Sequence, residues 1–173
     1  GFGLPGAIGA CYGNNCNDTI CISGDGGLQM NIQELQTIVH YNLPIKLFVL
    51  NNNGYLTIKS TQQNHFGRFV GAEKSSGVTC PDIIKVAAAY GLPTATIVNT
   101  EELNTKIDSI LKTPGPIVCE IIMSENQPLI PRVSSLKKPD GTIISKPIED
   151  LYPFLNREEF LGNMIIPPIE ILS

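Results

Sequence analysis

The chain has 173 residues, with 16 acidic against 12 basic side chains and a formal net charge of −4. This length fits one domain that buries about two-thirds of its unfolded surface, and the charge disfavours nucleic acid or an anionic membrane as the main partner. The sequence has no apolar run long enough to span a bilayer and no basic start with an apolar signal core. Because it starts at Gly1 inside a motif, we expect a fragment of a longer protein.

The cysteines indicate a reducing compartment. Their number is odd and none forms a CxxC pair: Cys11, Cys16, Cys21, Cys80 and Cys119. Cys21 and Cys119 lie in apolar, strand-like runs, which favours buried free thiols and a cytoplasmic location. The first three cysteines could in principle bind a metal, but they do not supply the closed set of four ligands typical of structural zinc sites.

The first third of the chain predicts two helices around a strand. Small residues over 6–12 would let a helix press closely on a sheet, and the β-branched run 19–23 predicts a strand that ends in a glycine-rich turn. Asn31 and Glu34 have the spacing of a capping box at the start of a helix, which Pro44 would end.

The middle of the chain continues the alternation of strands and helices. The run 45–50 contains Lys46 as its single polar residue, which fits a central parallel strand covered on both faces. Further elements are predicted as a helix over 81–90, a strand over 94–98, a helix capped by Thr100 and a strand over 117–123. This order predicts an α/β fold, a three-layer α/β/α sandwich with a mainly parallel sheet.

Residues 124–173 differ in character from the rest. Prolines interrupt the segment and its apolar residues show little periodicity, apart from a short helix expected near 158–164. We therefore expect residues 1–123 to form the domain core. Residues 124–173 would be an irregular carboxy-terminal extension that packs on this domain or on a neighbouring subunit.

Two polar motifs follow neighbouring predicted strands, and parallel α/β sheets bind ligands at such carboxyl ends. Asp25 can supply a carboxylate, Asn52 an amide oxygen and Gly54 a backbone carbonyl, which suits the octahedral oxygen ligation of Mg²⁺ beside a diphosphate. Gly26 and Gly27 lack side chains, so their amides could approach phosphates closely. Taken alone, each motif could be an ordinary turn or loop; their spacing favours a joint metal and diphosphate site.

The same residues carry a family resemblance. The chain closely resembles the diphosphate-binding domain of the acetolactate synthase group of thiamine diphosphate-dependent enzymes over roughly residues 1–123. The matching stretches are residues 1–10, Gly24 to Met30, Glu34-Leu35, Leu43 to Lys46 and Asn51-Asn52. The stretch from Glu149 to Glu159 also resembles the end of such chains.

The resemblance implies thiamine diphosphate and Mg²⁺ as cofactors. It implies metal ligands Asp25, Asn52 and Gly54, and a cofactor site formed by Gly24, Asp25, Gly26, Gly27, Gln29, Met30, Asn52, Gly54, Tyr55 and Leu56. Enzymes of this family decarboxylate a 2-oxo acid and join the remaining acyl group to a second carbonyl, and the cofactor carries that chemistry. With pyruvate as substrate the product would be 2-acetolactate.

Two departures leave the substrate open. Acetolactate synthases often carry Gly-Met shortly after the paired asparagines and a Trp beyond them, where this chain has Leu56-Thr57 and Thr61. A different thiamine diphosphate-dependent decarboxylase, carboligase or dione hydrolase is therefore an alternative, and a non-catalytic binding or assembly module is another.

The resemblance also implies partners. The glutamate that activates the cofactor is expected from a pyrimidine-binding domain of the same or a second chain, in a homodimer or tetramer, so the fragment alone should be inactive. The presence of FAD stays open. Glu34 is interpreted as part of the capping box, His40 as a residue late in a helix, and His65 as a surface residue in a polar loop or, alternatively, a residue at the active-site mouth.

Overall fold

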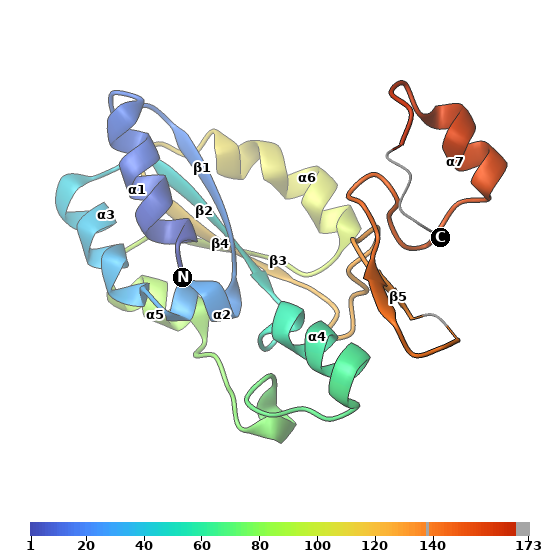
Figure 1. Cartoon of the computed structure of the whole chain (residues 1–173). Coiled ribbons are helices and arrows are strands. Elements are labelled where there is room, and N and C mark those ends of the chain that lie inside the picture. Colours follow the sequence, from blue (N-terminus) through green and yellow to red (C-terminus); the bar gives the residue numbers. More distant parts are fainter. Residues whose placement is uncertain (138, 169–173) are drawn as a thin grey trace. The chain divides into compact units, whose positions relative to one another are not determined.

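The computed structural model describes residues 1–137 and 139–168. The chain divides into two compact units, Gly1–Gln127 and Pro128–Ser173, and Figure 1 shows their elements. The first unit contains both predicted ligand-binding motifs, so we describe it first. Within the described residues no helix is both long and apolar enough to cross a membrane.

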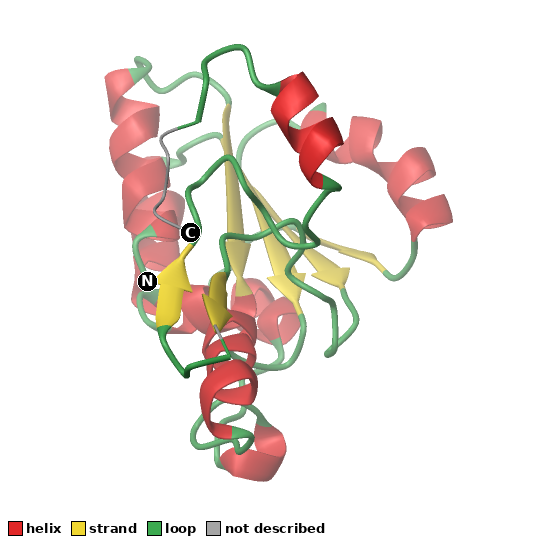
Figure 2. Ribbon diagram, turned by 45° about the vertical axis from the view of Figure 1, so that its right-hand side comes forward, coloured by secondary structure: helices red, strands yellow, loops and turns green. Residues whose placement is uncertain are grey.

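A four-stranded parallel sheet forms the centre of the first unit (Figure 2). The strands lie in the order β1-β2-β4-β3, with the bounds β1 Thr19–Gly24, β2 Ile45–Asn51, β3 Thr94–Ile97 and β4 Ile117–Ile122. Strand β2 is central, as its continuous apolar run predicted. The structure confirms the α/β fold with a mainly parallel sheet.

Helices cover both faces of this sheet. Their bounds are α1 Gly3–Gly13, α2 Asp25–Gln29, α3 Leu35–Tyr41, α4 Leu56–Phe66, α5 Ile83–Ala89 and α6 Thr100–Leu111, with short 3₁₀ turns η1 Ile32–Glu34 and η2 Lys74–Ser76. Residues of α1, α3 and α5 pack in one cluster with Leu47 and Val49 of β2. Ile110 of α6 packs in a second cluster with Phe48 and Cys119. Alternate residues of β2 thus face opposite layers of a sandwich.

Two predicted helix caps are wrong. Asn31 precedes η1 without a capping side-chain hydrogen bond, because its amide donates to the Gly1 carbonyl at 2.7 Å, while the Glu34 carboxylate accepts from Thr37 at 2.8 Å. The cap of α6 is Asn99 rather than Thr100, since the Asn99 side chain accepts from the Glu102 amide at 2.8 Å.

Lys46 has a structural role that its position in an apolar strand did not reveal. Its side chain is 2% exposed, and its ammonium donates to the backbone carbonyls of Thr113 and Gly115 and lies 3.7 Å from Asp18. These carbonyls belong to the loop between α6 and β4. The buried charge is therefore satisfied by the chain that leads into the neighbouring strand.

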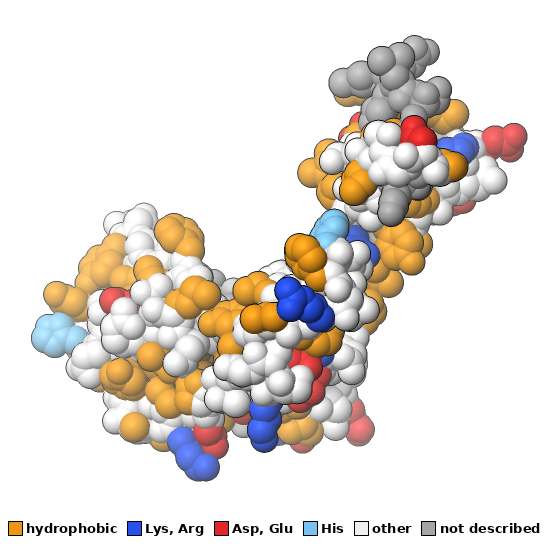
Figure 3. All heavy atoms as spheres, turned by 60° about the horizontal axis from the view of Figure 1, so that its bottom comes forward, with side chains coloured by type: hydrophobic (Ala, Val, Ile, Leu, Met, Phe, Trp, Pro, Cys, Tyr) orange, Lys and Arg blue, Asp and Glu red, His pale blue; other side chains and the backbone are white. Residues whose placement is uncertain are grey.

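Helix α4 was not predicted. It has eleven residues, and none of them is buried. Its sequence therefore lacks the apolar periodicity from which a helix is usually predicted. Ile58, Phe66 and the following Val70 remain exposed, and Figure 3 shows hydrophobic side chains gathered between charged ones on the surface. Packing against the core therefore contributes little to the position of this helix.

The second unit contains a two-stranded antiparallel sheet, β5 Ser135–Lys137 and β6 Ile143–Ser145, and helix α7 Arg157–Asn163, close to the predicted helix 158–164. Asp150 is 3% exposed and accepts two hydrogen bonds from the Arg157 guanidinium, at 2.8 and 2.9 Å. Those bonds lower the pKa of Asp150, with a further contribution from Lys146 at 3.3 Å. The buried Asp150 carboxylate is therefore neutralised by two cationic side chains, Arg157 and Lys146.

Candidate functional site

The two polar motifs meet at the carboxyl edge of the sheet. Asp25 directly follows β1, and Asn52 directly follows β2, whose Leu50 lies opposite Gly24 in the parallel register. Asp25 is 1% exposed, whereas Asn52 is half-buried. The strand ends therefore lie side by side, as predicted from the alternation of elements.

Asp25 joins the two motifs through its carboxylate. Its Oδ1 accepts from the Gly26 amide at 2.8 Å, and its Oδ2 accepts from the Gly54 amide at 3.0 Å. A carboxylate offers about four lone-pair positions, so each oxygen keeps capacity for a further partner. Two of the predicted metal-ligand residues, Asp25 and Gly54, are thus in direct contact.

Two glycines in this site permit close approaches that a side chain would prevent. A Cβ on Gly54 would lie 2.5 Å from the carbonyl oxygen of Ala72, and a Cβ on Gly26 would lie 2.6 Å from the ring of Tyr55. The Tyr55 amide also donates to the Ala72 carbonyl at 2.8 Å. The turn at 54–55 is therefore held between Asp25 and the segment around residue 72.

The remaining predicted cofactor residues lie around this turn. Gln29 and Met30 are exposed at the end of α2, and Leu56 is half-buried in the first turn of α4. The Gly26 amide is already bonded to Asp25, so its predicted approach to a phosphate requires that amide to be shared or released. These contacts stay predictions.

A cavity of about 810 Å³ opens beside the turn. Its lining includes Asn53, Glu73, Thr79, Cys80 and Glu125, which come from four separate stretches of the chain. Such a concave space with convergent polar groups is the usual setting of a small-molecule site.

Cys80 is a site residue that the sequence did not indicate. Burial, followed by the charge of the nearby Asp25 carboxylate and a hydrogen bond to it, raises the pKa of the Cys80 thiol to about 11. The thiol is therefore protonated at neutral pH and can donate to Asp25. In the sequence Cys80 lies in the segment Thr-Cys-Pro-Asp just before α5, and this pattern did not indicate a binding or catalytic role.

The histidines and Glu34 lie outside this contact network. His65 is exposed in the last turn of α4, not in a loop as predicted, and its ring lies 6.2 Å from that of Phe66. His40 is exposed in the last turn of α3, where it was expected. Glu34 is bonded to Thr37.

The donor set fits a hard cation. A carboxylate, an amide oxygen and a backbone carbonyl are the ligand types that Mg²⁺ prefers, and Asp25 retains unused lone pairs. No cluster of three or more His, Cys, Asp or Glu side chains suited to a metal occurs within residues 1–137 and 139–168. The predicted metal ligands differ from such a cluster, because only Asp25 among them is a carboxylate. Phosphate or water oxygens would have to complete the coordination of the metal.

Comparison with known proteins defines the class. Residues 1–121 match the family model described as "Thiamine pyrophosphate enzyme, C-terminal TPP binding domain". The match contains the whole sheet edge with Asp25 and Asn52. The chain therefore belongs to the thiamine pyrophosphate enzymes and contains their carboxy-terminal cofactor-binding domain.

Several curated proteins that the chain resembles are acetolactate synthases. The chain is 36% identical over 135 residues to an acetolactate synthase large subunit of Cyanidium caldarium, covering 78% of this chain and 23% of the relative. It is also 36% identical over 149 residues to the acetolactate synthase large subunit of Pyropia yezoensis, and this match covers 85% of this chain and 25% of the relative. It is 34% identical over 140 residues to "Acetolactate synthase 2, chloroplastic" of Nicotiana tabacum, and this match covers 78% of this chain and 21% of the relative. The chain thus spans about a quarter of the length of these relatives.

Proposed function

We propose that this chain holds thiamine diphosphate and Mg²⁺ in a full-length enzyme that converts two pyruvates into 2-acetolactate and carbon dioxide. The observation that carries the proposal is the buried Asp25 carboxylate, fixed by two backbone amides beside Asn52 at the carboxyl edge of the sheet. The family match over residues 1–121 supports the cofactor, and the acetolactate synthase relatives support the reaction.

In this proposal the chain's own residues bind and orient the cofactor. Asp25, Asn52 and the Gly54 carbonyl would hold Mg²⁺. Gly26, Gly27 and Tyr55 would contact the diphosphate, Gln29 and Met30 would lie near the thiamine, and Gly24 and Leu56 would complete the cofactor site. Bound thiamine diphosphate supplies the nucleophilic carbon that decarboxylation of a 2-oxo acid requires. The relatives' greater length supports a further domain, of this or a second chain, that supplies the activating glutamate.

The assembly around this domain is part of the same proposal. We expect a homodimer or tetramer in which residues 124–173 form the extension on the domain or on a neighbouring subunit. The five free cysteines support a reducing compartment, for which we propose the cytoplasm, although the tobacco relative is named chloroplastic.

Product analysis tests the reaction. Full-length protein supplied with pyruvate, thiamine diphosphate and Mg²⁺ is expected to release carbon dioxide and accumulate 2-acetolactate. Acetaldehyde as the sole product would identify a decarboxylase instead. The isolated 173-residue chain should form no acetolactate, because half of the active site is missing; acetolactate from this chain alone would overturn that part of the proposal.

A second substrate class has one specific observation in its favour. Thr57 and Thr61, which replace the Met and Trp frequent in acetolactate synthases, line an open cavity of about 350 Å³ on α4 together with Ile58 and Gln62. Smaller, polar side chains at this surface suit a larger or more polar acceptor. Another carboligase, decarboxylase or dione hydrolase would be recognised by turnover of such a substrate in place of pyruvate.

A further inference from the structure

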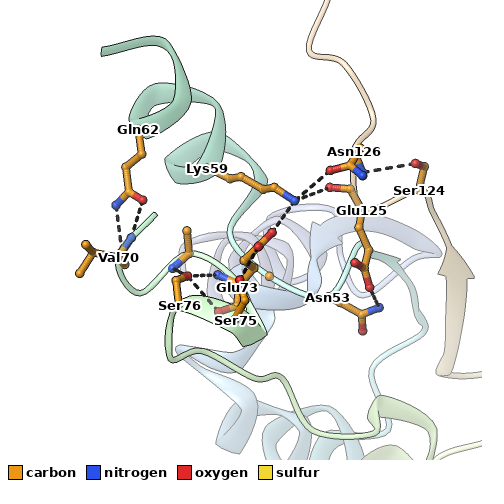
Figure 4. A network of polar contacts seen from close by, with 12 residues as sticks. Asn53, Lys59, Gln62, Val70, Glu73, Ser75, Ser76, Ser124, Glu125 and Asn126 are labelled. Carbon is orange, nitrogen blue, oxygen red and sulfur yellow. Dashed lines mark hydrogen bonds and ion pairs between the residues drawn. The ribbon is translucent and has the colours of Figure 1, made fainter. Parts of the chain in front are cut away.

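Lys59 of α4 bonds to three groups from two other parts of the first unit. Its ammonium pairs with the Glu73 carboxylate and donates to the Glu125 carbonyl at 3.2 Å and to Asn126 Oδ1 at 3.0 Å (Figure 4). A lysine has three N–H donors, so these partners can use all of them. The side chain is 16% exposed, which sets this pair apart from a surface ion pair.

The partners of Lys59 lead back to the turn that contacts Asp25. The backbone of Glu73 pairs with Gly54 in an antiparallel bridge. The side chain of Asn53 donates to Glu125 Oε1 at 2.7 Å. Lys59, Glu73, Gly54, Asn53 and Glu125 therefore form a closed ring of contacts around residues 53–54. Figure 4 draws the part of this ring that joins Asn53, Glu125, Lys59 and Glu73.

The segment that carries Glu73 is itself braced. Gln62 of α4 forms a pair of hydrogen bonds with the backbone of Val70, at 2.8 and 2.9 Å, as a neighbouring strand would. Ser76 Oγ accepts from the amides of Ala72 and Glu73 at 3.0 Å. Because α4 buries none of its residues, these polar contacts take the place of core packing in fixing the helix to segment 69–78.

Charge strengthens the link between Lys59 and Glu73. Hydrogen bonds from Lys59 and then from Ser75 lower the pKa of Glu73, so this carboxylate is ionised at neutral pH. Charge-assisted hydrogen bonds are stronger than neutral ones. Loss of the ammonium would leave the Glu73 carboxylate and two oxygen acceptors of residues 125–126 without this donor.

We propose that Lys59 is a positioning residue that holds the 53–55 turn against Asp25 and thereby sets the affinity of the site for Mg²⁺ and thiamine diphosphate. The role in affinity rests on the proposed function, whereas the role in holding the turn does not. Lys59 touches neither Asp25 nor the predicted diphosphate residues through its ammonium contacts; it acts through Glu73 and Glu125.

The test compares Lys59→Met with unchanged full-length protein by two measurements. Amide hydrogen exchange at Gly54 and Tyr55, without cofactor, is expected to accelerate about tenfold or more, because the turn opens more often. The dissociation constant for thiamine diphosphate in Mg²⁺ is expected to rise about 10- to 100-fold, the effect typical of residues that orient metal ligands. Lys59→Arg, which retains the charge and several donors, should recover part of both effects.

Lys106→Met is the matched control. Lys106 of α6 also pairs with a carboxylate, Glu102 at 2.9 Å, and donates to a backbone carbonyl, that of Thr96 at 3.1 Å, but it belongs to a helix remote from the turn in sequence and contacts. This variant should leave both measurements unchanged.

The outcomes separate the two proposals. Unchanged exchange at Gly54 and Tyr55 in Lys59→Met overturns the proposal that Lys59 holds the turn. Faster exchange with unaltered cofactor affinity overturns the proposal that Lys59 sets the affinity of the site. If the unchanged protein binds no thiamine diphosphate, the proposed function fails, and the exchange measurement alone then decides whether Lys59 holds the turn.

Discussion

Asp25→Ala is expected to abolish Mg²⁺-dependent binding of thiamine diphosphate. Asp25 is the one carboxylate of the proposed metal site, and the substitution removes both the ligand and the acceptor for the Gly26 and Gly54 amides. Mutation of residues that merely orient ligands typically costs about 10- to 100-fold in metal affinity, so loss of the ligand itself should cost about 100-fold or more. Isothermal titration calorimetry of the full-length protein in Mg²⁺ measures the affinity for thiamine diphosphate.

Folding and binding must be separated in this experiment. Two buried amides without an acceptor cost about 1–3 kcal/mol each, so Asp25→Ala should also lower the unfolding free energy. Asp25→Asn retains one oxygen and the side-chain volume, and should unfold closer to the unchanged protein while still binding poorly. Asp82→Asn, at the exposed cap of α5, removes an equal charge elsewhere and should bind normally. Normal Mg²⁺-dependent binding by Asp25→Asn would contradict the assignment of Asp25.

Gly54→Ala is expected to lower the unfolding free energy of the first unit by about 1–3 kcal/mol, the usual cost of forcing atoms into a packed site. The new Cβ would lie 2.5 Å from the Ala72 carbonyl oxygen, which is backbone and cannot turn aside. Relief of this clash requires the turn at 54–55 to move away from segment 69–78. Cofactor affinity should therefore fall as well. Chemical denaturation followed by circular dichroism measures the stability change.

Gly9→Ala provides a control of the same chemistry with the opposite expected sign. Gly9 lies exposed inside α1, and no atom beyond its chain neighbours and the backbone of its own helix lies within 4 Å of the added Cβ. Alanine there should raise the unfolding free energy by about 0.5–1 kcal/mol. A Gly54→Ala protein as stable as the unchanged one would show that the close approach at Ala72 does not constrain the turn.

The sheet and its binding edge were predictable because local pattern and topology agree. The apolar run that contains Lys46 reads as a buried parallel strand, and β2 is the central strand. Since the ends of parallel strands share an edge, the spacing of Asp25 and Asn52 placed them together. The comparisons confirm the family that these motifs resemble.

Elements governed by distant contacts were not predictable. Helix α4 has no buried residue, so its sequence shows no apolar periodicity. The capping box at Asn31 failed because the side chain binds the Gly1 carbonyl instead. Both cases depend on contacts between parts of the chain that no local pattern connects.

The same reason explains the residues missed around the site. Cys80 lies beside Asp25, which is 55 positions earlier in the chain, and Lys59 binds Glu125 and Asn126, more than 60 positions later. In the sequence, Lys59 resembles an ordinary surface residue and Cys80 an ordinary core residue. Only the folded chain shows that they surround the 53–55 turn.

We propose that this domain binds thiamine diphosphate through a metal held at Asp25. The most direct measurement is calorimetric titration of full-length protein with thiamine diphosphate, once in excess Mg²⁺ and once in excess EDTA. We predict saturable binding in Mg²⁺ that is lost in EDTA and regained when Mg²⁺ is restored. The same heat in EDTA would contradict the metal bridge, and the absence of binding in either condition would favour a module that retains the fold without the cofactor.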